Sequence, residues 1–152
     1  MGQCPLMFAF ELGANRRILE ILIEAGGDVG AIDCEDGRTA LHCAVEDDQL
    51  QVVEILLSRG CDVNPRNEDG RTPLHFACWL GSLHTVEILL GHNGIDANVV
   101  ANNGDTPLHM AVRRRKYKVV CAMLKQDSVN LEIVNKEYRT PLLEAVRTVT
   151  SE

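Results

Sequence analysis

The stretch Gly70-Arg71-Thr72-Pro73-Leu74-His75-Phe76-Ala77 decides how this chain folds, because it is repeated along the sequence. Close copies run from Gly37 to Ala44 and from Gly104 to Ala111, and a looser copy runs from Tyr138 to Ala145. The copies begin at positions 37, 70, 104 and 138, so they are spaced by 33 or 34 residues. A fixed period of this length is typical of proteins that stack short structural units. We therefore expect one elongated array.

Each copy predicts the start of a helix. The Thr hydroxyl can accept a hydrogen bond from a free N–H one turn into the helix, and Pro suits the first helical position because it has no N–H to satisfy. A break at Asp48, Gly81 and Arg115 is followed by a second, apolar helix, for example Val86-x-Ile88-Leu89-Leu90. We expect the first helices over residues 39–46, 72–80, 106–114 and 140–148.

The two ends of the chain depart from this pattern. Residues 5–10 are a candidate first helix without a Thr-Pro start, and Phe8 and Leu12 are more apolar than a finished cap would be. These features indicate either a domain cut from a longer protein or an unusual cap. At the other end, the Leu-rich second helix expected after Thr148 is missing. Because no unit of this kind can bury its apolar face alone, the end units should be the least stable.

The composition indicates a globular protein of a reducing compartment. Hydrophobic residues make up 45% of the 152 residues but aromatic residues only 4%, so the core must use Leu, Val, Ile, Ala and Cys. None of the six cysteines forms a Cys-x-x-Cys pair, and Cys43, Cys61 and Cys78 fall where small buried residues are expected. The chain has no signal peptide and no apolar run able to span a bilayer. We expect a cytoplasmic or nuclear location and no membrane partner.

The charge of the chain is unevenly spread. The net charge is −7, of which residues 1–76 contribute −8 and residues 77–152 contribute +1. Nucleic-acid binding needs a dominant basic field, so we do not expect a nucleic-acid partner. The gradient instead suits a protein partner with the opposite charge gradient.

The motif Gly-x-Thr-Pro-Leu-His-x-Ala, followed by Val-x-x-Leu-Leu and Gly-x-Asp-Val-Asn, closely resembles the ankyrin repeat family. The resemblance implies an all-α solenoid of stacked helix-turn-helix units with β-turn fingers, with about four repeats and a partial fifth. The departures are Ala40 for Pro, Leu143 for His and Tyr138 for Gly. Because Tyr138 brings a Cβ to a turn that favours Gly, we expect a shifted final finger. We expect residues 1–152 to form a single domain. Its repeats would span approximately residues 2–33, 34–66, 67–100 and 101–134, with a partial repeat at 135–152.

The resemblance also implies a function, which is recognition of another protein without catalysis. We expect a monomeric scaffold, adaptor or inhibitor with no cofactor or metal, and the alternative is a structural spacer or a self-assembling array. The sequence contains no Gly-rich phosphate loop, nucleophile motif or metal-ligand set that would indicate an enzyme. His42, His75 and His109 are expected to fix the loops by hydrogen bonds to Thr or to backbone. The Asp-x-Asn loops at Asn64 and Asn98 resemble sites of asparaginyl hydroxylation in this family.

The family pattern places partner-binding residues at the finger tips and at the ends of the first helices. Trp79, the single Trp, falls where the family shows a variable, exposed residue. Its ring could lie flat over a neighbouring first helix. We favour the hypothesis that Trp79 and Leu80 bury an apolar side chain of the partner, while residues 113–115 pair with its acidic groups. The complete predicted set is Glu35, Asp36, Arg38, Glu46, Asp47, Asp69, Arg71, Trp79, Leu80, Asn102, Asn103, Asp105, Arg113, Arg114 and Arg139.

The basic run at residues 113–118 has three interpretations that the sequence leaves open. It could be a solvated turn between two helices, or a surface that recognises an acidic or phosphorylated segment. The third interpretation is a nuclear-localisation patch or a nonspecific contact with nucleic acid. Steep salt dependence of partner binding would favour the second interpretation.

Overall fold

The computed structural model describes residues 4–33 and 35–150, and this part of the chain is built from α-helices, turns and loops. In this part of the chain, Ile32 and Thr39 form one isolated antiparallel β-bridge. The helices are α1 (Pro5–Glu11), α2 (Arg16–Glu24), α3 (Ala40–Glu46), α4 (Leu50–Ser58), α5 (Pro73–Leu80), α6 (Leu83–Leu90), α7 (Pro107–Arg113), α8 (Tyr117–Leu124) and α9 (Pro141–Thr150).

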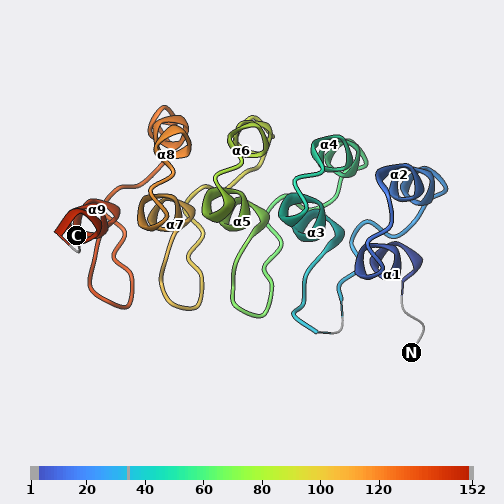
Figure 1. Cartoon of the computed structure of the whole chain (residues 1–152), viewed down its shortest axis with the longest axis horizontal. Helices are drawn as coiled ribbons and strands as arrows, with labels where there is room; N and C mark the ends of the chain where they lie inside the picture. The colour runs from blue at the N-terminus through green and yellow to red at the C-terminus, as the bar shows by residue number, and fades with distance from the viewer. Residues whose placement is uncertain (1–3, 34, 151–152) are drawn as a thin grey trace.

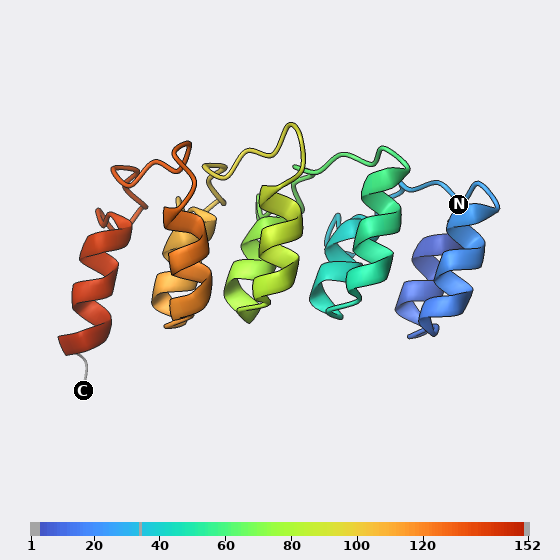
Figure 2. The same cartoon turned by 90° about the horizontal axis from the view of Figure 1, so that it is seen from above.

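The helices form two parallel rows (Figure 1). The first helices of the repeats, α1, α3, α5, α7 and α9, make one row, and the second helices, α2, α4, α6 and α8, make the other. Figure 2 shows the helix pairs side by side along the array, with α9 alone at the C-terminal end. The predicted all-α repeat solenoid is confirmed.

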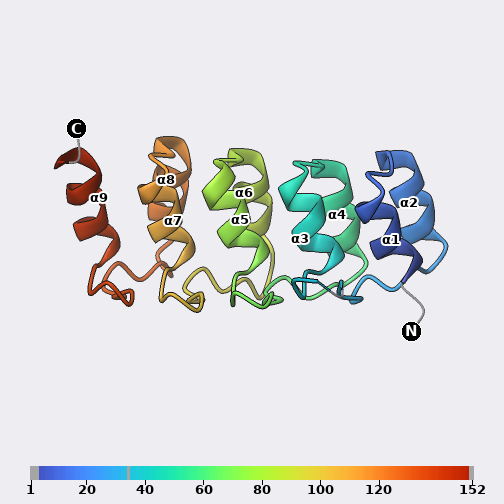
Figure 3. The same cartoon turned by 60° about the horizontal axis from the view of Figure 1, so that its bottom comes forward.

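The long loops that join each second helix to the next first helix project in one direction, past the row of first helices (Figures 1 and 3). We call these loops the fingers. Each first helix after α1 follows a finger and begins within a residue of its predicted start, because Thr39, Thr72 and Thr106 are N-caps. In each of these repeats the His three residues later completes a capping box.

The turns between the two helices of a repeat lie where the sequence places the breaks. Asp48, Gly81 and Arg115 all have positive φ, at 52°, 84° and 54°. A left-handed residue at this position reverses the chain after each first helix and starts the second helix. Two of the three are not Gly, so the short turn imposes this conformation even on residues with a Cβ.

The final finger is not shifted, so this expectation was wrong. Tyr138 adopts φ 59° in the same turn as the glycines, and its N–H donates to the Asn135 carbonyl at 2.9 Å. The equivalent bond from Gly104 to the Ala101 carbonyl is 2.8 Å long. A Cβ at Gly104 would lie 2.8 Å from the backbone N of Lys136 in the next finger. Tyr138 is 87% exposed, so its side chain points into open space and the turn accepts it.

The core runs along the array between the two rows of helices. Its largest fully buried apolar side chains are contributed about equally by first and second helices, and they are Leu6, Leu19, Ile23, Leu41, Leu56, Leu74, Leu89, Leu108 and Met123. Helix α9 packs mainly on α7 and leaves Leu142, Leu143, Val146 and Val149 exposed. The last repeat is therefore covered on one side only. Across the described residues, each helix is too short or too polar to cross a membrane.

Candidate protein-binding groove

Three buried histidines tie each first helix to the next finger. The backbone N–H of Thr39 donates to Nδ1 of His42 at 3.1 Å, which leaves the ring proton on Nε2. Nε2 donates to the Arg71 carbonyl in the next finger at 3.0 Å. His75 and His109 make the same pair of bonds, with Nε2 contacts of 3.1 and 2.9 Å to the carbonyls of the following fingers. The expected loop-fixing role of these residues is confirmed.

Burial keeps two of these rings neutral. It lowers the pKa of both His42 and His75 to about 4, because the protonated ring would lose its hydration. A neutral ring is needed here, since Nδ1 must accept a hydrogen bond while Nε2 donates one. The histidines are thus structural elements of the groove.

The fingers are also joined to one another at their tips. The N–H of Glu68 donates to the Asp36 carbonyl at 2.8 Å, and the N–H of Asn102 donates to the Asp69 carbonyl at 2.8 Å. Lys136 continues the series with a bond of 3.0 Å to the Asn103 carbonyl. These bonds hold the finger tips at a fixed spacing. The predicted tip residues are exposed on this surface, and they are Glu35, Asp36, Asp69, Asn102 and Asn103.

A cavity of about 250 Å³ lies in the groove where α3, α5 and α7 meet. Trp79 and Leu80, at the end of α5, line it and are 41% and 39% exposed. The guanidinium of Arg114, at the end of α7, lies 4.1 Å from the centre of the Trp79 ring, a cation–π contact. The ring is thus stacked against a side chain of the neighbouring repeat, yet much of it stays open to solvent. The remaining lining residues are Glu46, Arg71, His75, Phe76 and Met110.

Two arginines near this cavity differ in their partners. Arg38 donates to Asp33 at 3.0 Å and to Glu46 at 2.9 Å, so both it and Glu46 are engaged. The Nη1 atom of Arg71 lies 3.5 Å from a carboxylate oxygen of Asp69. Its Nε is buried, and the described residues provide no hydrogen-bond acceptor for it. Arg71 therefore brings unused donor capacity to the cavity wall.

Asp105 and Arg113 were predicted to face a partner, but they pair with each other inside the protein. Asp105 is fully buried and accepts from Arg113 at 2.7 and 3.0 Å, and from Asn135 at 2.8 Å. Arg113 also donates through Nε to Glu144 at 2.9 Å. The two residues join α7 to the last repeat, where Asp105 is fully buried and Arg113 keeps 24% of its side chain exposed. The prediction that Asp105 lies on the partner-binding surface was therefore wrong.

Glu144 is the centre of this ionic cluster, and the sequence analysis missed it. It occupies the position held by Phe76 and Met110 in earlier repeats, and it is fully buried. Arg147 donates to it at 2.8 Å, and Arg139, another predicted surface residue, lies at 3.3 Å. The sequence did contain a signal for this cluster, because Glu144 is an acidic residue at a position that is apolar in the other copies of the motif.

The arginines determine the charge of Glu144. Burial on its own would raise the pKa of this carboxyl, but hydrogen bonds from Arg147 and Arg113 outweigh burial and lower the pKa to about 2. Glu144 is therefore ionised at neutral pH. The carboxylate and its arginines therefore join the last repeat to α7, in addition to the bond from His109 to the Arg139 carbonyl.

The basic run at residues 113–118 does not form one continuous patch. Arg113 points into the ionic cluster, and Arg114 stacks on Trp79. The guanidinium of Arg115 donates to the backbone carbonyl of Thr148. The aliphatic stem of Lys116 lies over Gly81 in the neighbouring turn. The run is thus divided among separate surfaces, and Arg114 is the member that borders the groove cavity.

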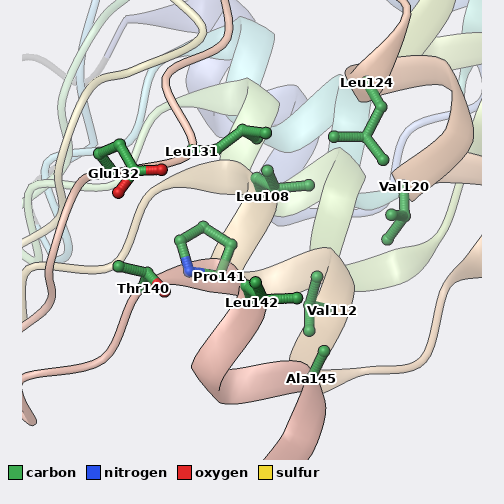
Figure 4. A pocket seen from close by; sticks show the side chains of 10 residues that line it. All are labelled: Leu108, Val112, Val120, Leu124, Leu131, Glu132, Thr140, Pro141, Leu142 and Ala145. Atoms are coloured by element: carbon green, nitrogen blue, oxygen red, sulfur yellow. The ribbon is translucent and has the colours of Figure 1, made fainter.

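A second cavity of about 320 Å³ lies at the C-terminal end, between α7, α8 and α9 (Figure 4). It lies beside α9, on the side of the second-helix row, where a further second helix would continue the pattern. Its lining is mainly apolar and comprises Leu108, Val112, Val120, Leu124, Leu131, Glu132, Thr140, Pro141, Leu142 and Ala145.

Asn64 and Asn98 bridge consecutive loops through both ends of their amides. Asn64 donates to the Gly94 carbonyl at 2.8 Å and accepts from the N–H of Asp96 at 2.9 Å. Asn98 makes the same pair of bonds, at 2.7 Å each, with Ser128 and Asn130. The two amides therefore set the register of adjacent loops, and their hydroxylation stays a prediction.

The expectation of small buried cysteines is met at Cys61 and Cys78, whereas Cys121 is exposed. Cys61 and Cys78 are buried and Cys43 is half-buried, while Cys34 lies outside the described residues. Burial raises the pKa of Cys43 to about 12 and that of Cys61 to about 11, so both remain thiols at neutral pH. Within the described part of the chain, no three His, Cys, Asp or Glu side chains gather in a way that could hold a metal ion.

Comparison with known families identifies the class of protein. A model described as ankyrin repeats (3 copies) matches residues 6–101, and one described as ankyrin repeats (many copies) matches residues 80–124. The chain therefore belongs to the ankyrin-repeat family, whose repeats generally mediate protein–protein interactions.

Several curated proteins share a segment with this chain. The B-cell lymphoma 3 protein homolog of Mus musculus is 38% identical over 63 residues, which are 41% of this chain and 14% of that protein. The E3 ubiquitin-protein ligase KEG of Arabidopsis thaliana is 40% identical over 53 residues, 35% of this chain and 3% of that protein. The BRCA1-associated RING domain protein 1 of Caenorhabditis elegans is 38% identical over 66 residues, 43% of this chain and 9% of that protein. The chain thus aligns with a small part of each relative.

Proposed function

We propose that this chain is a non-catalytic module that binds a partner protein in the groove formed by its fingers and first helices. In this role it would act as a scaffold, adaptor or inhibitor. The observation that carries the proposal is the cavity at Trp79 and Leu80, two large apolar side chains left partly exposed in the middle of the first-helix row. Trp is among the residues that contribute most to binding at protein interfaces.

The hydrogen bonds behind the groove support the same proposal. His75 fixes α5 to the following finger, and the finger tips are joined by backbone bonds. A surface that is already ordered loses little conformational entropy when a partner binds. The binding mechanism would be shape and charge complementarity on a rigid surface.

The test is affinity capture with chemical cross-linking, in which the wild type is compared with two matched double variants. Trp79→Ala/Leu80→Ala removes the exposed apolar pair of the groove, whereas Ile18→Ala/Ile21→Ala removes an exposed pair on α2, in the other row of helices. We expect a protein captured by the wild type and by the α2 variant to be lost from the groove variant. Circular dichroism and urea unfolding check that both variants fold. Equal capture of the same proteins by all three chains would overturn groove binding.

A self-assembling array is the second candidate, and the exposed apolar ends favour it. Phe8 and Leu12 at one end are 46% and 68% exposed, and Leu142 and Val149 at the other are 72% and 73% exposed. Sedimentation equilibrium over a range of concentrations distinguishes the two candidates. A mass that rises with concentration would support assembly through the ends, and a constant monomer mass would remove this candidate.

A further inference from the structure

We propose that the groove recognises a partner segment in which an apolar side chain and a neighbouring Asp or Glu bind together. The apolar side chain would enter the cavity beside Trp79, and the carboxylate would pair with Arg71. This inference rests on the proposed groove function and specifies the chemistry of its ligand.

The apolar part of the site is formed by side chains from two first helices. Phe76, Trp79 and Leu80 come from α5, and Met110 comes from α7. The cavity of about 250 Å³ suits one large apolar side chain and the backbone next to it. A ligand residue here would cover the exposed faces of Trp79 and Leu80, which is the favourable step of hydrophobic association.

The polar part of the site is Arg71, whose donor capacity is incompletely used. Its Nε is buried without an acceptor among the described residues, and its one carboxylate neighbour, Asp69, lies at 3.5 Å. Glu46 also lines the cavity, but it already accepts from Arg38 at 2.9 Å. The Arg71 side chain is 40% exposed, so a ligand carboxylate would bind the accessible part of its guanidinium, and charge-assisted bonds to Arg are among the stronger hydrogen bonds.

The number of available cations favours a carboxylate over a phosphate. Phosphate recognition by proteins usually relies on a cluster of arginines. Here Arg113 is engaged by Asp105 and Glu144, and Arg115 donates to Thr148. Arg71 remains on the wall of the cavity, with Arg114 above the Trp79 ring. So few cations suit the single charge of a carboxylate better than the roughly doubled charge of a phosphate.

The charges around the cavity also give the ligand a direction. On the N-terminal side, Glu35 and Asp36 at a finger tip and Asp47 after α3 are exposed. On the C-terminal side, the border of the cavity carries Arg114. A segment with a basic residue towards α3 and its acidic residue at Arg71 and Arg114 would match both ends, whereas the reversed segment would meet like charges.

The experiment is a selection of random peptides displayed on phage against four immobilised chains. They are the wild type, Trp79→Ala, Arg71→Gln, and Arg59→Gln as a control with the same loss of charge at the end of α4. We expect the wild type and Arg59→Gln to enrich peptides with an apolar residue close to Asp or Glu. For one enriched peptide, Arg71→Gln should weaken binding about tenfold. Changing the acidic residue of the peptide to its amide should weaken binding to the wild type but not further weaken binding to Arg71→Gln.

The outcomes separate this inference from the groove function on which it rests. If Trp79→Ala abolishes binding while Arg71→Gln and Arg59→Gln bind equally, the groove is a binding site but the carboxylate pairing is wrong. If Trp79→Ala enriches and binds the same peptides as the wild type, groove binding is wrong as well. Tighter binding of a phosphoserine version of the peptide would overturn the choice of carboxylate. Failure of the wild type to enrich any peptide would count against the inference.

Discussion

The middle repeats and the last repeat join their neighbours by different chemistry. In the middle of the array, a buried His bonds its own Thr and the next finger, and the same arrangement recurs at His42, His75 and His109. In the last repeat the corresponding residue, Leu143, is 52% exposed. At this last junction His109 still bonds the Arg139 carbonyl of the final finger, and the buried Glu144 with the arginines around it adds an ionic cluster that the middle junctions do not have.

This difference shows which features a repeat must keep. In both types of junction the buried side chain, a His ring or the Glu144 carboxylate, finds partners across the boundary, which is the requirement that burial imposes. The neutral ring does so without a charge, whereas Glu144 needs three arginines to offset its lost hydration. The middle repeats are also supported on both sides, while α9 packs mainly on α7. We therefore expect the middle junctions to carry global stability and the last junction to open locally.

The largest effect should come from removing a middle junction. His75→Ala leaves the Thr72 N–H and the Asp105 carbonyl unsatisfied and opens a cavity, so we expect a loss of about 4 kcal/mol in the free energy of unfolding. Leu143→Ala, at the same position of the last repeat, should cost less than about 0.5 kcal/mol, because this side chain is exposed. Urea unfolding of both variants measures the contrast. Similar losses for the two would contradict the difference between the junctions.

Acid should weaken the two junctions in different pH ranges. The folded pKa of His42 and His75 is about 4, below the unfolded value of 6.5, so the unfolded state takes up protons first and stability is lost as the pH falls from 6.5 towards 4. For the two residues together we expect a loss of about 4 kcal/mol between pH 7 and pH 5. The folded pKa of Glu144 is about 2 against 4.5 unfolded, so its contribution is lost only below pH 4.5.

Urea unfolding at pH 7 and pH 5, with hydrogen exchange of the α9 amides at both values, tests this separation. Global stability should fall while the local opening of α9 from α7 changes little over the same range. A free energy of unfolding that is the same at both pH values would show that the histidines are not kept neutral by the fold.

Loss of the charge at the last junction should have a smaller and more local effect. Glu144→Gln keeps the shape of the side chain but removes the buried carboxylate that accepts from Arg113 and Arg147, so we expect α9 to open more easily by about 2 kcal/mol. Glu137→Gln is the matched control, since Glu137 is exposed and pairs only with Arg139 among the described residues. Faster hydrogen exchange that is confined to α9 in Glu144→Gln would support a local effect of the lost charge. Equal exchange of the α9 amides in both variants would contradict it.

The sequence predicted the regular part of this molecule well because there the local and the tertiary signals agree. Thr-Pro starts, the breaks at Asp48, Gly81 and Arg115, and the His positions all recur on one period, and the structure places each as expected. The exposed position of Trp79 in the groove was predicted from the same register, and its role in binding stays a prediction. The ionic cluster was not predicted, because it joins residues 31 positions apart whose pairing depends on how two repeats dock.

The smallest effect should come from the finger tips, where the last repeat again differs from the middle ones. Tyr138 has φ 59°, a conformation that costs a residue with a Cβ about 1 kcal/mol, so Tyr138→Gly should stabilise the last finger by about that amount. Gly104→Ala should have the opposite sign, because its Cβ would lie 2.8 Å from the backbone N of Lys136. Hydrogen exchange of the Tyr138 amide, which donates to Asn135, measures the gain, and urea unfolding measures the loss. If Gly104→Ala left the free energy of unfolding unchanged, close stacking of the fingers could not explain why the middle repeats have Gly at this position. The presence of Tyr138 in the last finger would then need another explanation.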